Sequence, residues 1–375
     1  MLIGVPKEIK SDEYRIGLTP ESVQSLTQSG HEVLIEQNAG LGIGKDNKAY
    51  ENSGAEIVET REEIFQRAEM IVKVKEPQLE ECALLRPDQI LFTYLHLAPD
   101  PEQVKALLAS GCRAIAYESV KDQDGTYPLL TPMSEVAGRM AIQAGATCLE
   151  KPKGGLGRLI GGVTNVDPAE VVVIGGGVVG YNSIEIAIGM QANVTVLDKS
   201  AKRLDQLESI FGDKLNAVIA TEENNRECIK TADIVIGAVL IPGASAPKLI
   251  SRELVQSMKK GSVLVDVAID QGGCSETSRP TTHSDPTYEE EGVLHYCVAN
   301  MPGAVPMTST YALNNATIPY VLSLANNGLN EALSLDKGFC EGLNIHAGKV
   351  TITAVADEHD YDYHDPIELI KSLKQ

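Results

Sequence analysis

Short apolar runs alternate with amphipathic segments along the first third of the chain. The runs at residues 2–5, 33–35, 70–74, 90–95 and 114–117 have the length and composition of buried strands. Helical patterns lie between them, such as 20–26, where Thr19 can cap the helix and Pro20 occupies its first turn. Another helical pattern spans 101–110, before Gly111. This alternation predicts a parallel sheet with helices on both faces.

A second series of runs follows at 171–174, 194–197, 215–219, 233–239, 262–267 and 294–298. The intervening segment 134–168 reads as a helix capped by Ser134, followed by a loop. Residues 308–327 form a helical pattern in which Pro319 is expected to kink or restart the helix. The residues after it are too few for a domain and are expected to fold back on the first sheet.

The sequence therefore predicts an α/β protein with two doubly wound, mostly parallel-sheet domains of the Rossmann type. We expect residues 1–133 and 307–375 to form a discontinuous substrate domain, and residues 134–306 to form a nucleotide-binding domain. A ligand cleft is expected between the two domains.

A Gly-x-Gly-x-x-Gly pattern lies between strand 171–174 and the following helix, at Gly175, Gly177 and Gly180. The three glycines suit a tight turn, a close approach of backbone to a pyrophosphate, and close packing of helix on strand. An acid, Asp198, ends the next strand, where it can accept hydrogen bonds from an adenosine ribose. The context predicts dinucleotide binding, and Asp198 favours NAD over NADP because a carboxylate repels a 2′-phosphate.

Charged side chains follow the strands of the first domain instead of a phosphate-binding loop. If the sheet is parallel, Arg15, Lys75, His96 and Glu118 lie at one edge. An arginine can bind a carboxylate, a lysine can polarise a keto or imino group, and a histidine can move protons near neutral pH. This edge predicts a small carboxylate substrate.

Each of these side chains also has a simpler interpretation. Arg15 lies in a charged loop and could be solvated, and His96 could be a packed histidine. Lys73 and Lys75 alternate with apolar residues, as in a half-exposed edge strand.

Two acids belong to the strand at 262–267 and the turn after it. Asp270 enters a glycine-rich turn, so it is a candidate catalytic base or a turn cap. Asp266 lies inside the strand and is expected to be structural.

Composition narrows the partners and the compartment. The 375 residues carry a formal net charge of −20, which argues against nucleic acid and anionic membrane surfaces as partners. Seven cysteines without a Cys-x-x-Cys motif, and no leader-like N-terminus, predict a cytoplasmic protein with reduced cysteines. The histidine- and acid-rich segment 357–365 lacks regular ligand spacing, so we expect a surface turn and predict no metal site.

Several long strings resemble the alanine dehydrogenase family. They are residues 4–8, 13–15, 72–77, 94–98, 132–139, 267–273 and 297–302, together with the glycine pattern. The resemblance runs nearly end to end and implies reversible oxidative deamination of L-alanine to pyruvate and ammonia, with NAD as cofactor.

The resemblance also implies roles for individual residues. It assigns Arg15 and Lys75 to substrate binding, and His96 and Asp270 to catalysis. The residues it assigns to the cofactor are Ser134, Gly175, Gly177, Val178, Val179, Gly180, Asp198, Arg203, Val239, Leu240, Val267, Ala268, Ile269, Asp270, Arg279, Val298, Ala299, Asn300 and Met301.

The chain departs from the family pattern in places. Ala220 stands where members often have a serine, and Asn327 stands where some have a histidine that shares a metal with the residue matching Glu118. The family implies a homo-oligomer, typically a hexamer. Two alternative functions are open. One is the soluble nucleotide-binding subunit of a proton-translocating transhydrogenase, which shares this architecture but generally lacks the lysine and histidine seen here as Lys75 and His96. The other is a non-catalytic NAD(H) sensor.

Overall fold

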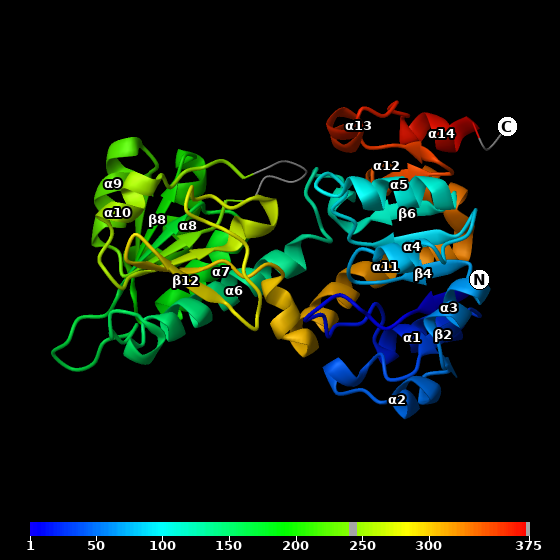
Figure 1. The fold of residues 1–375 in the computed structure, drawn as a ribbon, viewed down its shortest axis with the longest axis horizontal. Helices are drawn as coiled ribbons and strands as arrows, with labels where there is room; N and C mark the ends of the chain where they lie inside the picture. Colours follow the sequence, from blue (N-terminus) through cyan, green and yellow to red (C-terminus); the bar gives the residue numbers. More distant parts are fainter. Residues whose placement is uncertain (240–245, 373–375) are drawn as a thin grey trace. The chain divides into compact units, whose positions relative to one another are not determined.

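The computed structural model describes residues 1–239 and 246–372 and divides into two compact units (Figure 1). Unit 1 comprises Met1–Met133 and Gly303–Gln375, and unit 2 comprises Ser134–Pro302. Each unit contains one mostly parallel sheet with helices. The predicted α/β class with two doubly wound sheets is confirmed.

The described residues of unit 1 form an eight-stranded sheet in the order β15-β14-β6-β5-β4-β1-β2-β3. The first six strands along the chain are parallel, whereas β14 and β15 are antiparallel to their neighbours. The strands are β1 (Leu2–Val5), β2 (Glu32–Glu36), β3 (Glu56–Val58), β4 (Met70–Val72), β5 (Ile90–Thr93), β6 (Arg113–Ala116), β14 (Leu343–His346) and β15 (Lys349–Val350).

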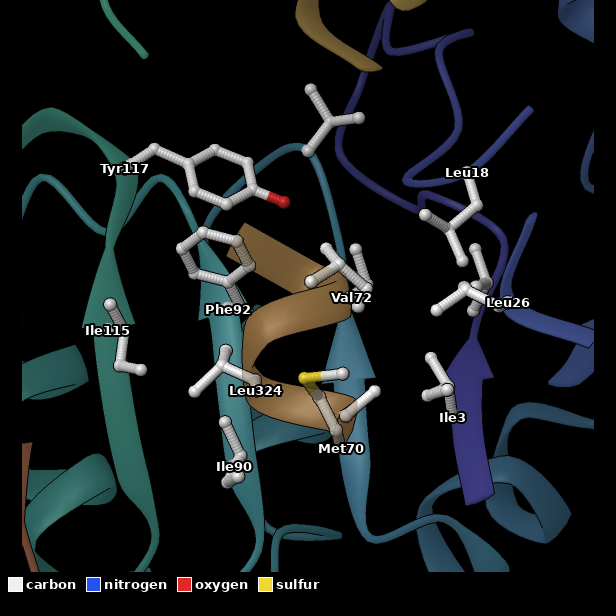
Figure 2. Packing of buried hydrophobic residues seen from close by; sticks show 14 of the residues in the cluster. Ile3, Leu18, Leu26, Met70, Val72, Ile90, Phe92, Ile115, Tyr117 and Leu324 are labelled. Atoms are coloured by element: carbon white, nitrogen blue, oxygen red, sulfur yellow. The ribbon is translucent and has the colours of Figure 1, made fainter. Parts of the chain in front are cut away.

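Helices cover both faces of this sheet. They are α1 (Pro20–Gln28), α2 (Asn47–Asn52), α3 (Arg61–Arg67), α4 (Leu79–Cys82), α5 (Pro101–Ser110), α11 (Pro306–Leu335), α12 (Lys337–Cys340), α13 (Thr353–His359) and α14 (Pro366–Ser372). Alternate residues of β5 enter different clusters: Phe92 packs with Tyr117 and Leu324 of α11, whereas Leu91 packs on the opposite face. Figure 2 shows Leu324 lying against β4 and β5, so the chain after unit 2 supplies part of this core.

In unit 2, residues 134–239 and 246–302 form a seven-stranded sheet in the order β12-β13-β11-β10-β7-β8-β9. All pairs are parallel except β12 with β13. The strands are β7 (Glu170–Ile174), β8 (Asn193–Asp198), β9 (Leu215–Ile219), β10 (Ile234–Gly237), β11 (Val263–Asp266), β12 (Thr287–Glu290) and β13 (Val293–Tyr296). The helices are α6 (Thr131–Cys148), α7 (Val178–Gly189), α8 (Ala201–Phe211), α9 (Glu222–Thr231) and α10 (Arg252–Ser257).

The two sheets share one feature that locates ligand sites. In each sheet the chain starts in the middle, builds outward to one edge, and then returns to the other side of the first strand. The reversal falls between β1 and β4 in unit 1 and between β7 and β10 in unit 2. Open parallel sheets bind ligands beyond the carboxyl ends of their strands at this switch point.

The structure corrects several local predictions. Helix α6 begins at Thr131, so Ser134 lies in its first turn and is not the cap, because Pro132 fits the first turn of a helix. Helix α11 continues through Pro319, and the non-helical residue is Gly328, with φ 73° and ψ 169°.

Four strands were not predicted: β3, β12, β14 and β15. Strands β3, β12 and β15 are edge strands of only two to four residues, too short or too polar for an apolar run to indicate them.

Candidate functional site

The glycine turn after β7 fills the switch point of unit 2. Gly175 has φ 97°, and a Cβ there would lie 2.9 Å from Cγ2 of Val239, just beyond β10. A Cβ on Gly180 would overlap the carbonyl oxygen of Gly175. At Gly177, by contrast, a Cβ would meet nothing within 4 Å among the described residues. The turn itself needs glycine at 175 and 180, whereas the space at Gly177 is open to a ligand.

The first turn of α7 offers backbone N–H groups at this position. Gly177 is the N-cap residue and provides no side-chain cap. Val178 is 42% exposed, whereas Val179 is buried. An uncapped helix start carries partial positive charge and free donors, which suits a diphosphate.

Two side chains bind the Gly176 peptide from either side. Asp198 at the end of β8 accepts the Gly176 N–H at 2.7 Å, and Arg203 Nε donates to the Gly176 carbonyl oxygen at 2.6 Å. Both side chains therefore fix the shape of the glycine turn, in addition to any contact with a ligand.

A short 3-10 turn, Val267–Gln271, follows β11 and carries four of the sequence-predicted residues. Asp266 is fully buried, and its carboxylate accepts the N–H groups of Ala268 at 3.1 Å and Cys274 at 2.9 Å. Asp266 is structural, as the sequence indicated. Asp270 is exposed on the same turn, so its carboxylate is accessible to a substrate.

The remaining predicted cofactor residues lie at neighbouring strand ends or beside them. Val239 is half-buried after β10, and Leu240 lies outside the described residues. After β13, Val298 and Met301 are buried, Ala299 and Asn300 are half-buried, and Asn300 has φ 63°. Ser134 is half-buried in α6.

Arg279 lies with its guanidinium carbon 3.8 Å from the ring centroid of Tyr288, a cation–π contact that fixes its orientation. The backbone N–H of Arg279 also donates to the Tyr288 hydroxyl at 2.8 Å. No sequence pattern indicated a role for Tyr288.

The carboxyl ends of the unit 2 strands together fit a dinucleotide. They combine an open backbone position at Gly177, the uncapped start of α7, and the acid Asp198 at the end of β8. These are the elements that bind pyrophosphate and ribose in doubly wound folds.

In unit 1, strand β4 lies between β1 and β5, so the edge-strand interpretation of Lys73 and Lys75 is wrong. Lys73 is fully buried, with Nζ 2.9 Å from Glu8 and 2.9 Å from Glu81. Burial lowers the pKa of Lys73, but the Glu8 and Glu81 carboxylates outweigh burial and raise the pKa above its ordinary value. Lys73 is therefore a buried structural cation.

Lys75 leaves the same strand end with its peptide bound on both sides. Its N–H donates to Glu8 at 3.3 Å, and its carbonyl oxygen accepts the Thr93 hydroxyl at 2.9 Å. The neighbouring Val74 N–H donates to the same Glu8 oxygen at 2.6 Å. The backbone that carries Lys75 is thus fixed by side chains from two other segments.

Arg15 is 3% exposed, so its interpretation as a solvated loop residue is wrong. Glu13 accepts from Arg15 Nε at 2.7 Å and from Nη2 at 2.5 Å, and Met133 Sδ lies 3.0 Å from Nη1. Glu13 therefore fixes the guanidinium plane of Arg15 by a bidentate contact.

His96 is exposed after β5, so the packed-histidine interpretation is wrong. Its ring stacks on the buried Tyr94 ring with centroids 5.8 Å apart and an interplanar angle of 12°. The backbone N–H of His96 donates to the Glu118 carboxylate at 2.6 Å. One face of the imidazole rests on Tyr94, and the backbone below it is bound by Glu118.

Glu76 shows that these charges lie near one another. Burial raises its pKa, but Lys75, Lys10 and His96 together lower it below its ordinary value. Lys75 and His96 therefore act on one carboxylate at the carboxyl edge of the sheet.

No sequence pattern indicated a role for Glu8 or Glu13. A Lys-Glu pair after a strand resembles a solvated loop, and only the fold shows that these carboxylates turn inward. The signal that could have identified them is a charged segment directly after the first strand, at the position of a switch point.

Across the described parts of the chain, every helix is too short or too polar to span a lipid bilayer. No group of three or more His, Cys, Asp or Glu residues arranged to hold a metal occurs within residues 1–239 and 246–372.

Comparisons with known proteins agree over almost the whole chain. The family described as alanine dehydrogenase/PNT, N-terminal domain, matches residues 4–137, and its C-terminal domain matches residues 141–353. Alanine dehydrogenase of Methanococcus maripaludis is 55% identical over 364 residues, covering 97% of this chain and 98% of that protein. Alanine dehydrogenase of Bacillus subtilis is 54% identical over 364 residues, covering 97% and 96%.

Solved structures give the same result. An L-alanine dehydrogenase structure superposes with a TM-score of 0.93 at 49% identity, covering 96% of this chain and 99% of that one. A transhydrogenase from Sinorhizobium meliloti superposes with a TM-score of 0.81 at 24% identity, covering 94% and 100%, and shares the fold.

Proposed function

The chain belongs to the alanine dehydrogenase/PNT family, and on that premise we propose that it catalyses reversible NAD-dependent oxidative deamination of L-alanine to pyruvate and ammonia. The observation that carries this proposal is near end-to-end identity of 54–55% with two alanine dehydrogenases. The comparisons favour an oxidoreductase acting on the CH–NH₂ group over the transhydrogenase subunit, whose likeness extends to the fold alone.

In this proposal unit 1 binds the substrate. Arg15 binds the alanine carboxylate, since Glu13 fixes its guanidinium and orients its donors. Lys75 binds the carboxylate or the carbonyl oxygen, from a backbone bound by Glu8 and Thr93. The two cations would select a small substrate with a carboxylate and hold its Cα in one place.

His96 and Asp270 move the protons. Both are exposed, as groups that must reach a substrate and water are. We propose that they take and return protons at the amino nitrogen and at the water that adds to the imine before ammonia leaves.

Unit 2 holds the cofactor through the glycine turn, the start of α7 and Asp198. NAD, when bound, accepts the hydride that leaves the alanine Cα. The backbone N–H groups at Val178 and Val179 would bind its diphosphate, and Asp198 would bind the adenosine ribose.

The direct experiment is an assay of the purified protein with L-alanine and NAD, following NADH. We expect NADH to form with L-alanine and NAD, and NADPH to form more slowly when NADP replaces NAD. No NADH above background would overturn the proposal and return the chain to a non-catalytic role.

A panel of small amino acids sharpens the assay. Serine, glycine and 2-aminobutyrate differ from alanine by little volume, and a methylene in an apolar pocket is worth only about 1–3 kcal/mol. We expect weaker activity with these amino acids than with L-alanine.

We further propose that the protein is a cytoplasmic homo-oligomer, a hexamer by its family resemblance. Seven free thiols, most of them buried, support a reducing compartment. Light scattering coupled to size exclusion measures the assembly directly, and a monomer would contradict this proposal.

A further inference from the structure

In unit 1 a glutamate binds the backbone N–H of each residue proposed to meet the substrate. The three contacts are Lys75 N–H to Glu8 at 3.3 Å, Arg15 N–H to Glu13 at 3.0 Å, and His96 N–H to Glu118 at 2.6 Å. Glu8 also pairs with Lys73, and Glu13 also binds the Arg15 side chain. Glu118 differs from both, because its contacts are with backbone N–H groups and include no ion pair among the described residues.

Glu118 binds two consecutive peptides at the end of β5. Its carboxylate accepts the His96 N–H at 2.6 Å and the Leu95 N–H at 3.1 and 3.2 Å. Within the described residues, the Glu118 side chain has no salt-bridge partner, unlike those of Glu8 and Glu13. Hydrogen bonds to an ionised acceptor are roughly twice as strong as neutral ones, so this carboxylate is well suited to bind a backbone turn.

The turn that Glu118 binds is conformationally unfavourable. His96 has φ 49°, in the left-handed region that residues with a Cβ rarely occupy. Such a conformation is strained and persists only where surrounding contacts hold it. The hydrogen bonds from the Leu95 and His96 N–H groups to Glu118 hold this conformation. Glu118 reaches them from the neighbouring strand, because it follows β6 in the 3-10 turn Tyr117–Ser119.

The position of the imidazole depends on this turn. The ring lies flat against Tyr94, which is buried and donates its hydroxyl to the Leu129 carbonyl oxygen at 2.5 Å. Tyr94 is therefore a fixed platform, and a change in φ at His96 would lift the ring from it. A group displaced by about 1 Å from its productive position can lose on the order of a hundredfold in rate.

We propose that Glu118 is a positioning residue for His96, which holds the imidazole in its working place by binding the Leu95 and His96 N–H groups. The inference rests on the proposed function, in which His96 transfers protons. It assigns Glu118 a role through the backbone of its own unit, separate from any metal.

The test compares Glu118→Ala, which removes the acceptor, with Glu118→Gln, which keeps an acceptor oxygen. The assays contain a chelator, so that metal binding does not contribute. For Glu118→Ala we expect kcat to fall roughly 10- to 100-fold, while KM for L-alanine and the directly titrated Kd for NADH stay near wild type. Glu118→Gln should recover most of kcat.

A matched control is Glu341→Gln. Glu341 is a part-exposed glutamate of the same unit that binds Lys121 at 2.8 Å, and its loss should leave kcat unchanged. Hydrogen–deuterium exchange gives a readout that needs no activity. Peptides containing Leu95 and His96 should exchange faster in Glu118→Ala than in the wild type, and those in the glycine turn of unit 2 should not.

Three results would overturn the inference while leaving the proposed function intact. One is a Glu118→Ala enzyme with wild-type kcat, and another is unchanged exchange at Leu95 and His96. The third is a Glu118→Gln enzyme as impaired as Glu118→Ala, because charge and not backbone binding would then be the cause. A wild-type protein without alanine-dependent NADH formation would instead overturn the proposed function.

Discussion

The six parallel strands follow the same order in the two units, but the units fix their functional groups in opposite ways. Unit 2 removes side chains: glycines at 175 and 180 let backbone segments touch where a Cβ would collide. Unit 1 adds side chains: Glu8, Glu13 and Glu118 each bind the backbone N–H of a residue with an ionisable side chain. The same topology therefore supports a site built from backbone and a site built from ionised side chains.

The difference follows from what each site binds. A diphosphate is recognised by backbone N–H groups, which must be approached closely and need no protein counter-charge. A small carboxylate is recognised by cations, and a cation at a buried position needs its own carboxylate partners to remain charged. The carboxylates of unit 1 are thus the counterpart of the glycines of unit 2.

The largest effect is expected from His96→Ala, which removes a proton-transfer group from unit 1. General acid–base groups contribute roughly 10²- to 10⁴-fold to rate, so kcat should fall by that factor. NADH affinity, measured by fluorescence titration, should remain nearly unchanged. His31→Ala is the control, because His31 precedes β2 at the other end of the parallel strands and binds Asn326. Near-normal turnover of the His96 variant would mean that unit 1 contributes no proton-transfer group through His96.

Lys73→Met tests the charge balance beneath the substrate residues. Removing one partner of a buried ion pair costs about 3–5 kcal/mol, because Glu8 and Glu81 would be left as unpaired buried charges. Urea denaturation followed by circular dichroism should show this loss in the free energy of unfolding. The exposed pair Lys371–Glu368 is the control, and Lys371→Met should leave the free energy of unfolding nearly unchanged, because solvent screens this pair. Equal effects of the two substitutions would mean that the buried network does not stabilise unit 1.

Asp198→Ala tests the acid that binds the Gly176 N–H in the glycine turn. Hydrogen bonds to charged groups are worth about 1.5–3 kcal/mol, so NAD affinity should fall roughly 10- to 100-fold. The preference for NAD over NADP should shrink, because the repulsive carboxylate is gone. Asp205→Ala, on the exposed side of α8, should leave both affinities unchanged. An undiminished preference for NAD would place cofactor selection elsewhere.

The smallest effect is expected from Gly177→Ala, where the protein itself has room for a methyl group. Folding stability should be unchanged, while Kd for NAD should rise about fivefold, or about 1 kcal/mol, since the methyl group occupies the approach of the diphosphate. Gly189→Ala at the end of α7 is equally unhindered and should leave Kd unchanged. Equal Kd values for both variants would show that no ligand approaches Gly177.

Much of this contrast could be predicted from the sequence, because each part depends on local patterns. Apolar runs located the central strands, and the spacing of the glycines and Asp198 indicated a dinucleotide. The carboxylates could not be found in this way. Glu8 binds Lys73, which lies 65 residues later, and a strand pattern does not show which of two neighbouring lysines turns inward. Edge strands such as β12 were also missed, because their partly exposed positions carry polar residues and form no apolar run.

The discontinuity of unit 1 has a consequence for biosynthesis. Residues 134–302 leave the ribosome as one uninterrupted segment, so unit 2 can fold during translation. Unit 1 cannot be completed until α11 and β14 have been synthesised. Asn314 of α11 binds the Thr19 N–H and the Gly17 carbonyl oxygen, and β14 pairs with β6. A nascent chain therefore completes unit 2, with its glycine turn, before the sheet of unit 1 and the helix α11 that packs on it are complete. Chaperone dependence and degradation of stalled products should accordingly fall on the earliest-made part of the polypeptide.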